Sequence, residues 1–244
     1  MTRYLINFSY DGSNYNGYQK QKGLNTIQGK MEEALKQINN NKNTKFSSSG
    51  RTDAFVHAIN QYGHCDIDVN ITEYKLKRAL NSLLPDDIYV KSTKVVDDEF
   101  HSRYNAKKKE YIYKINMGEF NPIERKYVYQ LGKKLNIEKM KEAINYIIGT
   151  YDFKYLSSNE IEEKNTIRTI YNAKIKIKDN YLEMSFIGSG FLKYMVRIIV
   201  GILIQIGLEK YDVKEMKNIL EGKGKTNYKK IAPPEGLYLK SVTY

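Results

Sequence analysis

The 244-residue sequence predicts an α+β protein made of two α/β halves. Hydrophobic patterns in residues 1–96 follow the order strand, helix, strand, strand, helix, strand, which is typical of a split βαβ domain. Related strand and helix patterns follow in the rest of the chain, with no flexible linker between the two sets. Hydrophobic residues make up 41% of the composition, so a chain of this length can bury a core. We expect the halves to span residues 1–104 and 105–244.

The first half contains four expected strands and two expected helices. Residues 3–10 alternate between apolar and polar positions and predict a strand. Thr26 is a suitable N-cap for a helix over residues 27–38, and Thr72 for a second helix that stops at Pro85. The remaining strand-like runs are residues 44–48, 59–67 and 88–96.

The second half repeats this mixture with a more apolar helix. Asn136 is a suitable N-cap for a helix that carries apolar residues as far as Ile148. The most apolar helix of the chain is expected at residues 191–208. The other expected elements are a strand at 110–117, a hairpin of 168–177 and 181–187, a short helix at 213–220 and a last strand at 238–242.

The chain is strongly basic, with 40 Lys and Arg against 28 Asp and Glu, a net charge of +12. Such an excess commonly indicates a polyanionic partner, most often a nucleic acid. The 22 tyrosines suit RNA binding, because their rings can stack on bases. The alternatives are a basic protein without such a partner, and Lys-, Ile- and Asn-rich usage inherited from a genome of low G+C content. The basic run at residues 107–109, near the junction of the halves, suits either a phosphate contact or a solvated connection.

The single cysteine, Cys65, excludes an intramolecular disulfide and a Cys-based zinc site. The chain enters a strand pattern directly after its first residues, without the pattern of a signal peptide. Its longest apolar run, residues 198–208, is too short to span a bilayer and contains Gln205. We therefore expect a soluble cytoplasmic protein with no membrane segment.

The segment 48–58, between two strand-like runs, is the first candidate for chemistry. It contains Gly50, which permits unusual backbone angles, and Arg51 and Asp53, which share a face if the segment is extended. A short loop between strands can hold a carboxylate rigidly as a nucleophile or base. Asp53 could equally satisfy backbone N–H groups in a turn, and the residues of this segment alone favour that second interpretation.

Two polar residues in apolar elements are further candidates. Arg197 lies within the most apolar helix, so we expect its guanidinium to be buried beside a carboxylate. Asp53 is a suitable partner, since a neighbouring Arg would keep it ionised and nucleophilic. The alternative is that Arg197 lies on an exposed stripe of the helix. Tyr111 is the other candidate, although an ordinary half-buried strand tyrosine is the simpler interpretation.

Taken together, these residues resemble the tRNA pseudouridine synthase A family. Residues 50–58, with the sequence GRTDAFVHA, are similar to the family's active-site motif. Other similar blocks occur in the family's order and extend the resemblance over almost the whole chain. They are residues 10–12 with 17–19, 26–28, Asn81 with 84–85, 100–103, 110–113, 152–153, Phe191 with 195–197, and 232–239.

The resemblance implies a pseudouridine synthase fold, in which two α/β halves share a mainly antiparallel sheet with a central RNA-binding cleft. It implies isomerisation of uridine to pseudouridine at positions 38 to 40 of the tRNA anticodon stem-loop, by a homodimer without cofactor or metal. Asp53 matches the nucleophile, Tyr111 the ring that packs on the target base, and Arg197 the ion-pair partner of Asp53. The remaining substrate-binding residues are expected to be Arg51, Phe191, Gln19 and Lys107.

The sequence departs from the family pattern at two positions. Phe55 replaces a glycine two residues after Asp53, which bears on loop conformation and substrate fit. Tyr18 replaces a tryptophan and keeps an aromatic ring. Two other functions stay open on this evidence: an RNA-binding or RNA-folding protein that has lost catalysis on the same scaffold, and a synthase that acts on a different RNA.

Overall fold

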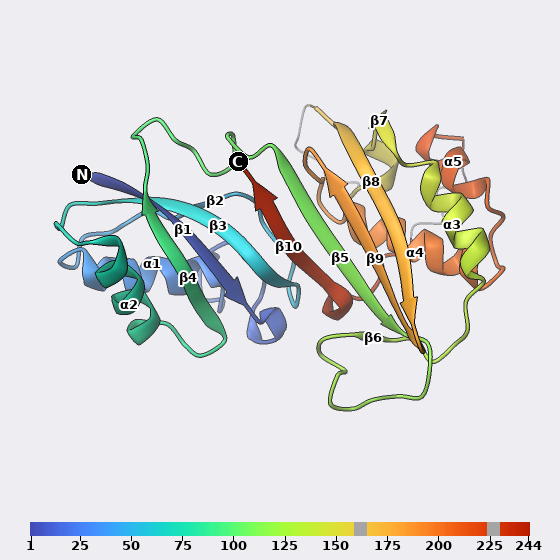
Figure 1. Cartoon of the computed structure of the whole chain (residues 1–244), viewed down its shortest axis with the longest axis horizontal. Coiled ribbons are helices and arrows are strands. Elements are labelled where there is room, and N and C mark those ends of the chain that lie inside the picture. The colour runs from blue at the N-terminus through green and yellow to red at the C-terminus, as the bar shows by residue number, and fades with distance from the viewer. Residues whose placement is uncertain (159–164, 224–229) are drawn as a thin grey trace. The chain divides into compact units, whose positions relative to one another are not determined.

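The computed structural model describes residues 1–158, 165–223 and 230–244, which form two compact units (Figure 1). The first unit comprises Met1–Lys107 together with Tyr238–Tyr244, and the second comprises Lys108–Leu237. The first unit therefore ends its main segment at residue 107, whereas the sequence led us to expect a boundary after residue 104. The last strand also differs from expectation, because it belongs to the first unit although it follows the second along the chain.

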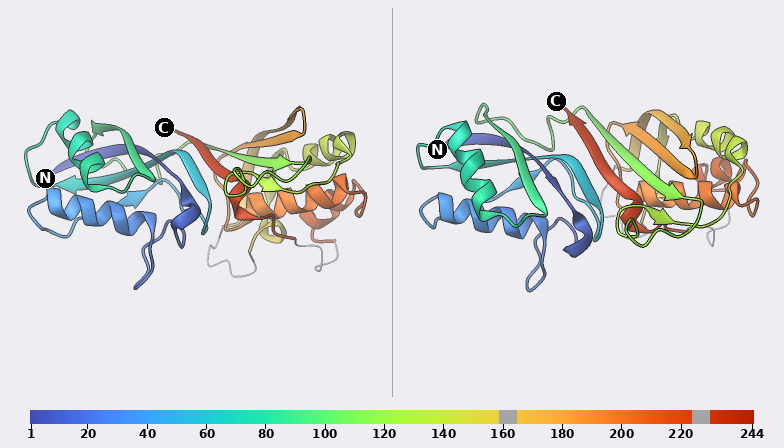
Figure 2. Two further views of the ribbon diagram at one scale, coloured as in Figure 1. Left: turned by 90° about the horizontal axis from the view of Figure 1, so that it is seen from below. Right: turned by 60° about the horizontal axis from the view of Figure 1, so that its bottom comes forward.

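The first unit is a mostly antiparallel sheet with two helices. Its strands lie in the order β4-β1-β3-β10, with β2 paired to β3, and β10 is parallel to β3. Helix α1 lies along one face of this sheet, and α2 packs beside β4 (Figure 2). The elements are β1 (Thr2–Tyr10), α1 (Ile27–Ile38), β2 (Ser47–Ser48), β3 (His57–Ile67), α2 (Glu73–Leu83), β4 (Ile88–Val95) and β10 (Leu237–Thr243).

The second unit is a sheet covered by the apolar helix α4. Its strands lie in the order β5-β9-β8-β7, all antiparallel along this path, and β6 pairs with β5 in parallel. Helix α4 runs along one face of the sheet, and α3 packs against α4 (Figure 2). The elements are β5 (Lys108–Asn116), β6 (Tyr129–Gln130), α3 (Ile137–Asn145), β7 (Gly149–Asp152), β8 (Ile167–Lys178), β9 (Tyr181–Gly188), α4 (Met195–Gly207) and α5 (Glu215–Leu220).

The predicted helix caps are confirmed. The side chain of Thr26 accepts a hydrogen bond from the N–H of Gly29, and that of Thr72 accepts one from Lys75. The side chain of Asn136 caps α3 in the same way. Each cap satisfies an N–H group that has no partner inside the helix, which fixes where the helix begins.

Three expected elements are shorter than their hydrophobic patterns suggested. Helix α4 begins at Met195 rather than 191, because Tyr194 adopts a left-handed conformation with φ of 61°. Helix α3 ends at Asn145, so Ile147 and Ile148 lie beyond it. Of the run 44–48, only Ser47–Ser48 pairs with β3. Apolar residues continue past these boundaries because some residues of the adjoining loops, such as Phe46, Ile147 and Leu192, are also buried, so hydrophobicity alone does not mark where an element ends.

A buried contact joins the segment 100–103 to β3. The Nδ1 atom of His64 accepts a hydrogen bond of 3.2 Å from the backbone N–H of Ser102, whose hydroxyl donates to the Ser47 carbonyl at 2.6 Å. Burial, with a smaller contribution from the neighbouring His101, lowers the pKa of His64 to about 4. An imidazole whose Nδ1 accepts an N–H must be unprotonated at that atom, so the geometry and the pKa agree.

This contact predicts acid sensitivity at mildly acidic pH. In the unfolded chain His64 takes up a proton near its ordinary pKa of about 6.5, whereas in the folded protein it stays neutral until about pH 4. The stability that His64 contributes should therefore be lost as the pH falls from about 6.5 towards 4. Thermal unfolding of wild type and His64→Gln between pH 7 and 5 checks this. The wild-type midpoint should fall more steeply, and equal slopes would contradict the assignment.

Candidate active site

Strand pairing brings two loops of the first unit together at one end of its sheet. Strands β1 and β3 are antiparallel, and Tyr10 at the end of β1 lies opposite Ala58 at the start of β3. The loop that leaves β1, residues 11–18, therefore emerges beside the loop that enters β3, residues 49–56. We call the second of these the Asp53 loop. The sequence separates them by more than thirty residues, but the sheet makes them neighbours.

The two loops pack so closely that glycine is required at their contact. A Cβ atom on Gly12 would lie 2.1 Å from the carbonyl oxygen of Val56, a distance that no side chain can tolerate. A Cβ on Gly17 would lie 3.2 Å from backbone atoms of both Thr52 and Ala54, and Gly17 also has a φ of +96°. The backbone N–H of Tyr18 donates to the Thr52 carbonyl at 3.0 Å. The first loop thus holds the Asp53 loop by backbone contacts.

Buried polar side chains support the Asp53 loop from its other side. Gln61 on β3 is completely buried; its amide donates to the Gly50 carbonyl at 3.0 Å, and its oxygen accepts from the Ser49 hydroxyl at 2.5 Å. The hydroxyls of Tyr10 and Thr52 are 2.8 Å apart. Gln61 was not among the residues predicted from the sequence, although a glutamine at an inward-facing position of a strand is itself a signal, because a buried amide needs partners.

Imidazole contacts complete this support at the start of β3. The Nδ1 atom of His57 lies 3.1 Å from the backbone N–H of Gly12 and accepts from it. The His57 ring stacks on Tyr238 of β10, with ring centroids 4.7 Å apart. The segment that follows the Asp53 loop is therefore tied both to the first loop and to the last strand of the chain.

Asp53 opens a β-turn. The N–H of Val56 donates to the Asp53 carbonyl at 3.3 Å, and the third residue of the turn, Phe55, has a φ of 65°. Positive φ at this position alone is the pattern of a type II turn, where glycine is favoured. The Asp53 side chain is half-buried. The sequence left open whether Asp53 serves a turn or chemistry; its carbonyl closes the turn, and a catalytic role for its carboxylate stays a prediction.

Three predicted substrate-binding residues of the first unit are exposed. Arg51 precedes Asp53 in its loop, and Gln19 follows the loop of residues 11–18. Lys107 lies at the end of the unit, where its backbone N–H donates to the Thr243 carbonyl of β10 at 2.8 Å. Arg51 therefore lies within the Asp53 loop and Gln19 directly follows the other contacting loop, whereas Lys107 is attached to the last strand.

In the second unit, the structure brings Tyr111 and Phe191 together. Tyr111 lies on β5 opposite Phe186 of β9 and is 8% exposed. The Phe191 ring meets it edge to face, with ring centroids 5.1 Å apart and planes at 79°. Phe191 lies in the segment between β9 and α4 rather than within the helix, as the sequence had suggested. The contact with Phe191 restricts the Tyr111 ring to a defined orientation.

Arg197 is less buried than predicted. Every other residue of the thirteen in α4 is buried, but Arg197 is only half-buried. Its Nε donates to the Ala232 carbonyl at 2.8 Å, and its guanidinium lies 5.3 Å from the centre of the Tyr194 ring. The guanidinium is thus fixed at one edge of a helix that is otherwise inside the core. We predicted full burial because the residues around Arg197 are apolar on every side of the helix. The structure shows that the position of Arg197 itself is partly accessible to solvent.

The positive charge of Arg197 also affects the pKa of a carboxylate within the second unit, Glu235. Burial raises the pKa of Glu235, and the positive charge of Arg197 partly offsets that effect. Glu235 lies within the segment 232–239, which our sequence analysis matched to a family block without giving this residue a role. The predicted pair of Asp53 with Arg197 joins residues of different units and stays a prediction.

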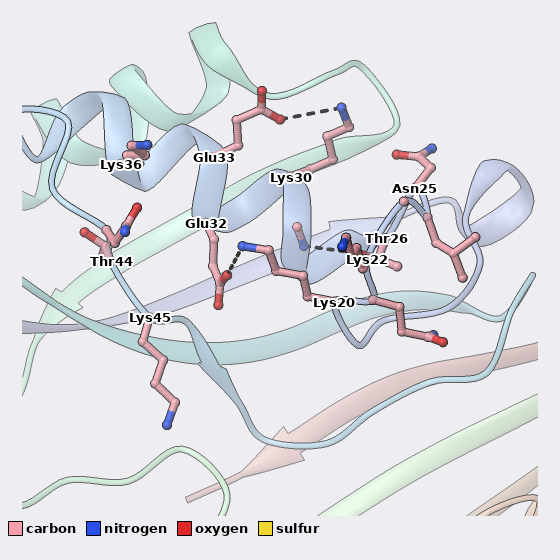
Figure 3. Close-up of a pocket in the computed structure, with 15 residues that line it drawn as sticks. Lys20, Lys22, Asn25, Thr26, Lys30, Glu32, Glu33, Lys36, Thr44 and Lys45 are labelled. Carbon is pink, nitrogen blue, oxygen red and sulfur yellow. Dashed lines mark hydrogen bonds and ion pairs between the residues drawn. The ribbon is translucent and has the colours of Figure 1, made fainter.

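A basic groove lies elsewhere in the first unit, between α1, residues 20–26 and residues 43–45 (Figure 3). Its volume is about 930 Å³. Two of its lysines pair with carboxylates, Lys20 with Glu32 at 2.8 Å and Lys30 with Glu33 at 3.6 Å. The other lysines in the lining are Lys22, Lys36 and Lys45. The groove therefore has a positive excess, and none of the predicted catalytic residues lines it.

The described parts of the chain contain no group of three His, Cys, Asp or Glu side chains placed to hold a metal ion. No helix among the described residues is long and apolar enough to cross a membrane.

Comparison with known proteins gives full-length matches. A family model described as tRNA pseudouridine synthase matches residues 6–105 and 143–244. Proteins named tRNA pseudouridine synthase A from Anoxybacillus flavithermus and Limosilactobacillus reuteri are 41% and 39% identical, over 100% of this chain and 99% and 97% of their own lengths. A solved archaeal box H/ACA complex of Nop10 and Cbf5 is 14% identical over 84% of this chain and 42% of that one, with a TM-score of 0.33, too low to inform the fold.

The packing of Gly17 against the Asp53 loop predicts a local effect of added bulk. Gly17→Ala should both strain the backbone and push against Thr52 and Ala54, so we expect activity to fall at least tenfold and stability by about 1–2 kcal/mol. Gly23→Ala is the matched control, since Gly23 also has a positive φ, +76°, but nothing within 4 Å of the added Cβ. Its stability loss should be smaller, because it arises from backbone strain alone, and its activity should be near wild type. Equal activity in both variants would show that the loop contact does not position Asp53.

Proposed function

The chain belongs to the tRNA pseudouridine synthase family, and we propose from this premise that it isomerises uridine to pseudouridine in tRNA. The observation that carries the proposal is the Asp53 loop, in which a half-buried carboxylate is held by a close glycine contact and a completely buried glutamine. Such rigidity suits a nucleophile, because catalytic groups gain most when their position is fixed before the substrate binds.

We assign the chemical roles as follows. Asp53 acts as the nucleophile while the glycosidic N1–C1′ bond breaks; the base rotates and C5 joins C1′. The C5 proton is lost and N1 gains one, so the product is an isomer of the substrate. The buried edge of Tyr111 against Phe191 supports a role in packing on the base, since the ring is held in one orientation. The target nucleotide must leave its stack to reach these groups, as in other enzymes that modify bases.

Arg197 is assigned the role of keeping Asp53 ionised in the complex with RNA. The fixed guanidinium, held by the Ala232 carbonyl, supports this role because it is presented in one geometry at the edge of α4. Bound RNA would exclude water and favour a protonated, non-nucleophilic carboxylate unless a positive charge lay nearby.

The preferred substrate is the anticodon stem-loop at positions 38 to 40, and the active form is a homodimer. Both assignments rest on the resemblance of the sequence blocks to the tRNA pseudouridine synthase A family. The net charge of +12 and the positive excess of the groove in Figure 3 support phosphate contacts beyond the target nucleotide, with Arg51, Gln19 and Lys107 as exposed contacts. We also propose a cytoplasmic location, which a tRNA substrate supports.

Asp53→Asn should abolish pseudouridine formation and preserve the fold and tRNA binding. The amide keeps the size of the side chain and much of its hydrogen bonding, and the turn is closed by the Asp53 carbonyl, so the loop should survive. Tritium release from tRNA labelled at C5 of uridine measures turnover, and filter binding measures affinity. Substantial turnover by Asp53→Asn would remove Asp53 from the mechanism. Binding by the wild-type protein without turnover would favour the RNA-binding alternative.

Arg197→Met should reduce turnover at neutral pH far more than stability. The hydrogen bond to Ala232 that the change removes is worth about 1 kcal/mol, and the other contacts of the half-buried guanidinium are lost with it. Without the positive charge, Asp53 would be protonated more readily in the RNA complex, so turnover should partly recover as the pH rises. Arg197→Lys keeps the charge and should retain more activity with a flatter pH profile. Near-normal turnover by Arg197→Met at pH 7 would contradict the proposed role.

A further inference from the structure

The turn that follows Asp53 carries a residue that its backbone does not favour. Phe55 is third in a turn closed by the Val56 N–H and the Asp53 carbonyl, and its φ is 65°. Its own N–H also donates to the Tyr15 carbonyl at 3.4 Å, so contacts on both sides hold this conformation. Glycine adopts positive φ without strain, whereas a residue with a Cβ does not. Phenylalanine is therefore energetically unfavourable here compared with glycine.

The Phe55 side chain does not compensate for this strain by packing in the core. It is 48% exposed, although the flanking Thr52 and Val56 are buried. Among the described residues, no aromatic ring pairs with it and no cation lies over it, whereas Tyr10 and Tyr18 both have ring contacts close by. The turn therefore directs a large apolar ring towards solvent, two residues from the carboxylate.

An exposed aromatic ring on a backbone of fixed conformation is well suited to stacking on a nucleobase. Stacking needs a flat apolar face within reach of the base, and the turn fixes the point from which the Phe55 ring extends towards solvent. Resting on the proposed function, we propose that the Phe55 ring stacks on an unpaired base of the tRNA beside the target uridine. A base whose neighbour has left the stack exposes one face to an apolar side chain, and the ring would cover that face.

Phe55→Gly separates binding from folding, because it removes the ring and suits the turn. We expect this variant to unfold at no lower temperature than wild type. Its Kd for tRNA, measured in an Asp53→Asn background so that no turnover intervenes, should rise roughly tenfold. In the active background, KM should rise with the Kd. Phe55→Tyr keeps the ring and should bind like wild type, whereas Phe55→Leu keeps the bulk and the strain and should bind weakly.

Tyr74→Leu is the matched control for Phe55→Leu. Tyr74 is 68% exposed on α2, in the same unit, and its replacement should leave the Kd unchanged. A 2-aminopurine placed beside the target uridine should be quenched on binding by wild type and Phe55→Tyr but less by Phe55→Leu and Phe55→Gly. Unchanged Kd and quenching in Phe55→Gly would overturn the proposal. Since these readouts need no turnover, a protein that binds tRNA through Phe55 but makes no pseudouridine would contradict the proposed function alone.

Discussion

The close approach of two backbones at the end of β1 and β3 is the constraint on which the Asp53 loop depends. Antiparallel pairing places residues 11–18 beside residues 49–56, and the absence of side chains at Gly12 and Gly17 lets the two backbones meet. Once they meet, the Tyr18 N–H can reach the Thr52 carbonyl, and this hydrogen bond holds the start of the Asp53 turn against the first loop. A glycine in one loop thus determines the position of a carboxylate in the other.

In the second unit, a glycine likewise lets two backbones approach closely, here beside Arg197. A Cβ on Gly201 of α4 would lie 1.7 Å from the Lys230 carbonyl oxygen, so the segment after residue 230 runs directly against the helix backbone. This contact brings Ala232 within reach of Arg197, whose Nε and carbonyl oxygen both bond to the Ala232 backbone, at 2.8 and 3.0 Å. An apolar helix can therefore present one guanidinium in a fixed geometry, because a backbone carbonyl satisfies part of it.

The two departures from the family pattern differ in physical consequence. Tyr18 is 2% exposed, so its ring serves the interior of the first unit, where burial raises its pKa well above the ordinary value. Replacing one buried aromatic ring by another leaves the surface of the loop unchanged. Phe55 does the opposite, since it alters the surface beside Asp53 and leaves the interior as it was. Only the second change can affect what the loop touches outside the protein.

Periodicity and capping residues in the sequence were sufficient to predict the order of most strands and helices. Thr26, Thr72 and Asn136 cap helices where predicted, because capping is a local interaction between a side chain and N–H groups two or three residues away. Family blocks such as residues 50–58 also identified Asp53 as a candidate, since a motif is itself a local pattern. The ends of α3 and α4 were less predictable, because buried loops continue the apolar pattern.

The sequence by itself thus determined the element order, the caps and the candidate residues. Only the tertiary structure decided that β10 joins the first unit, that Gln61 supports the Asp53 loop, and that Arg197 is half-buried against Ala232. Only the tertiary structure also shows that Gly17 contacts the Asp53 loop and that Phe55 has a strained backbone conformation. The physical reason is that each depends on contacts between segments far apart in the chain, whose geometry is set by strand pairing and backbone packing.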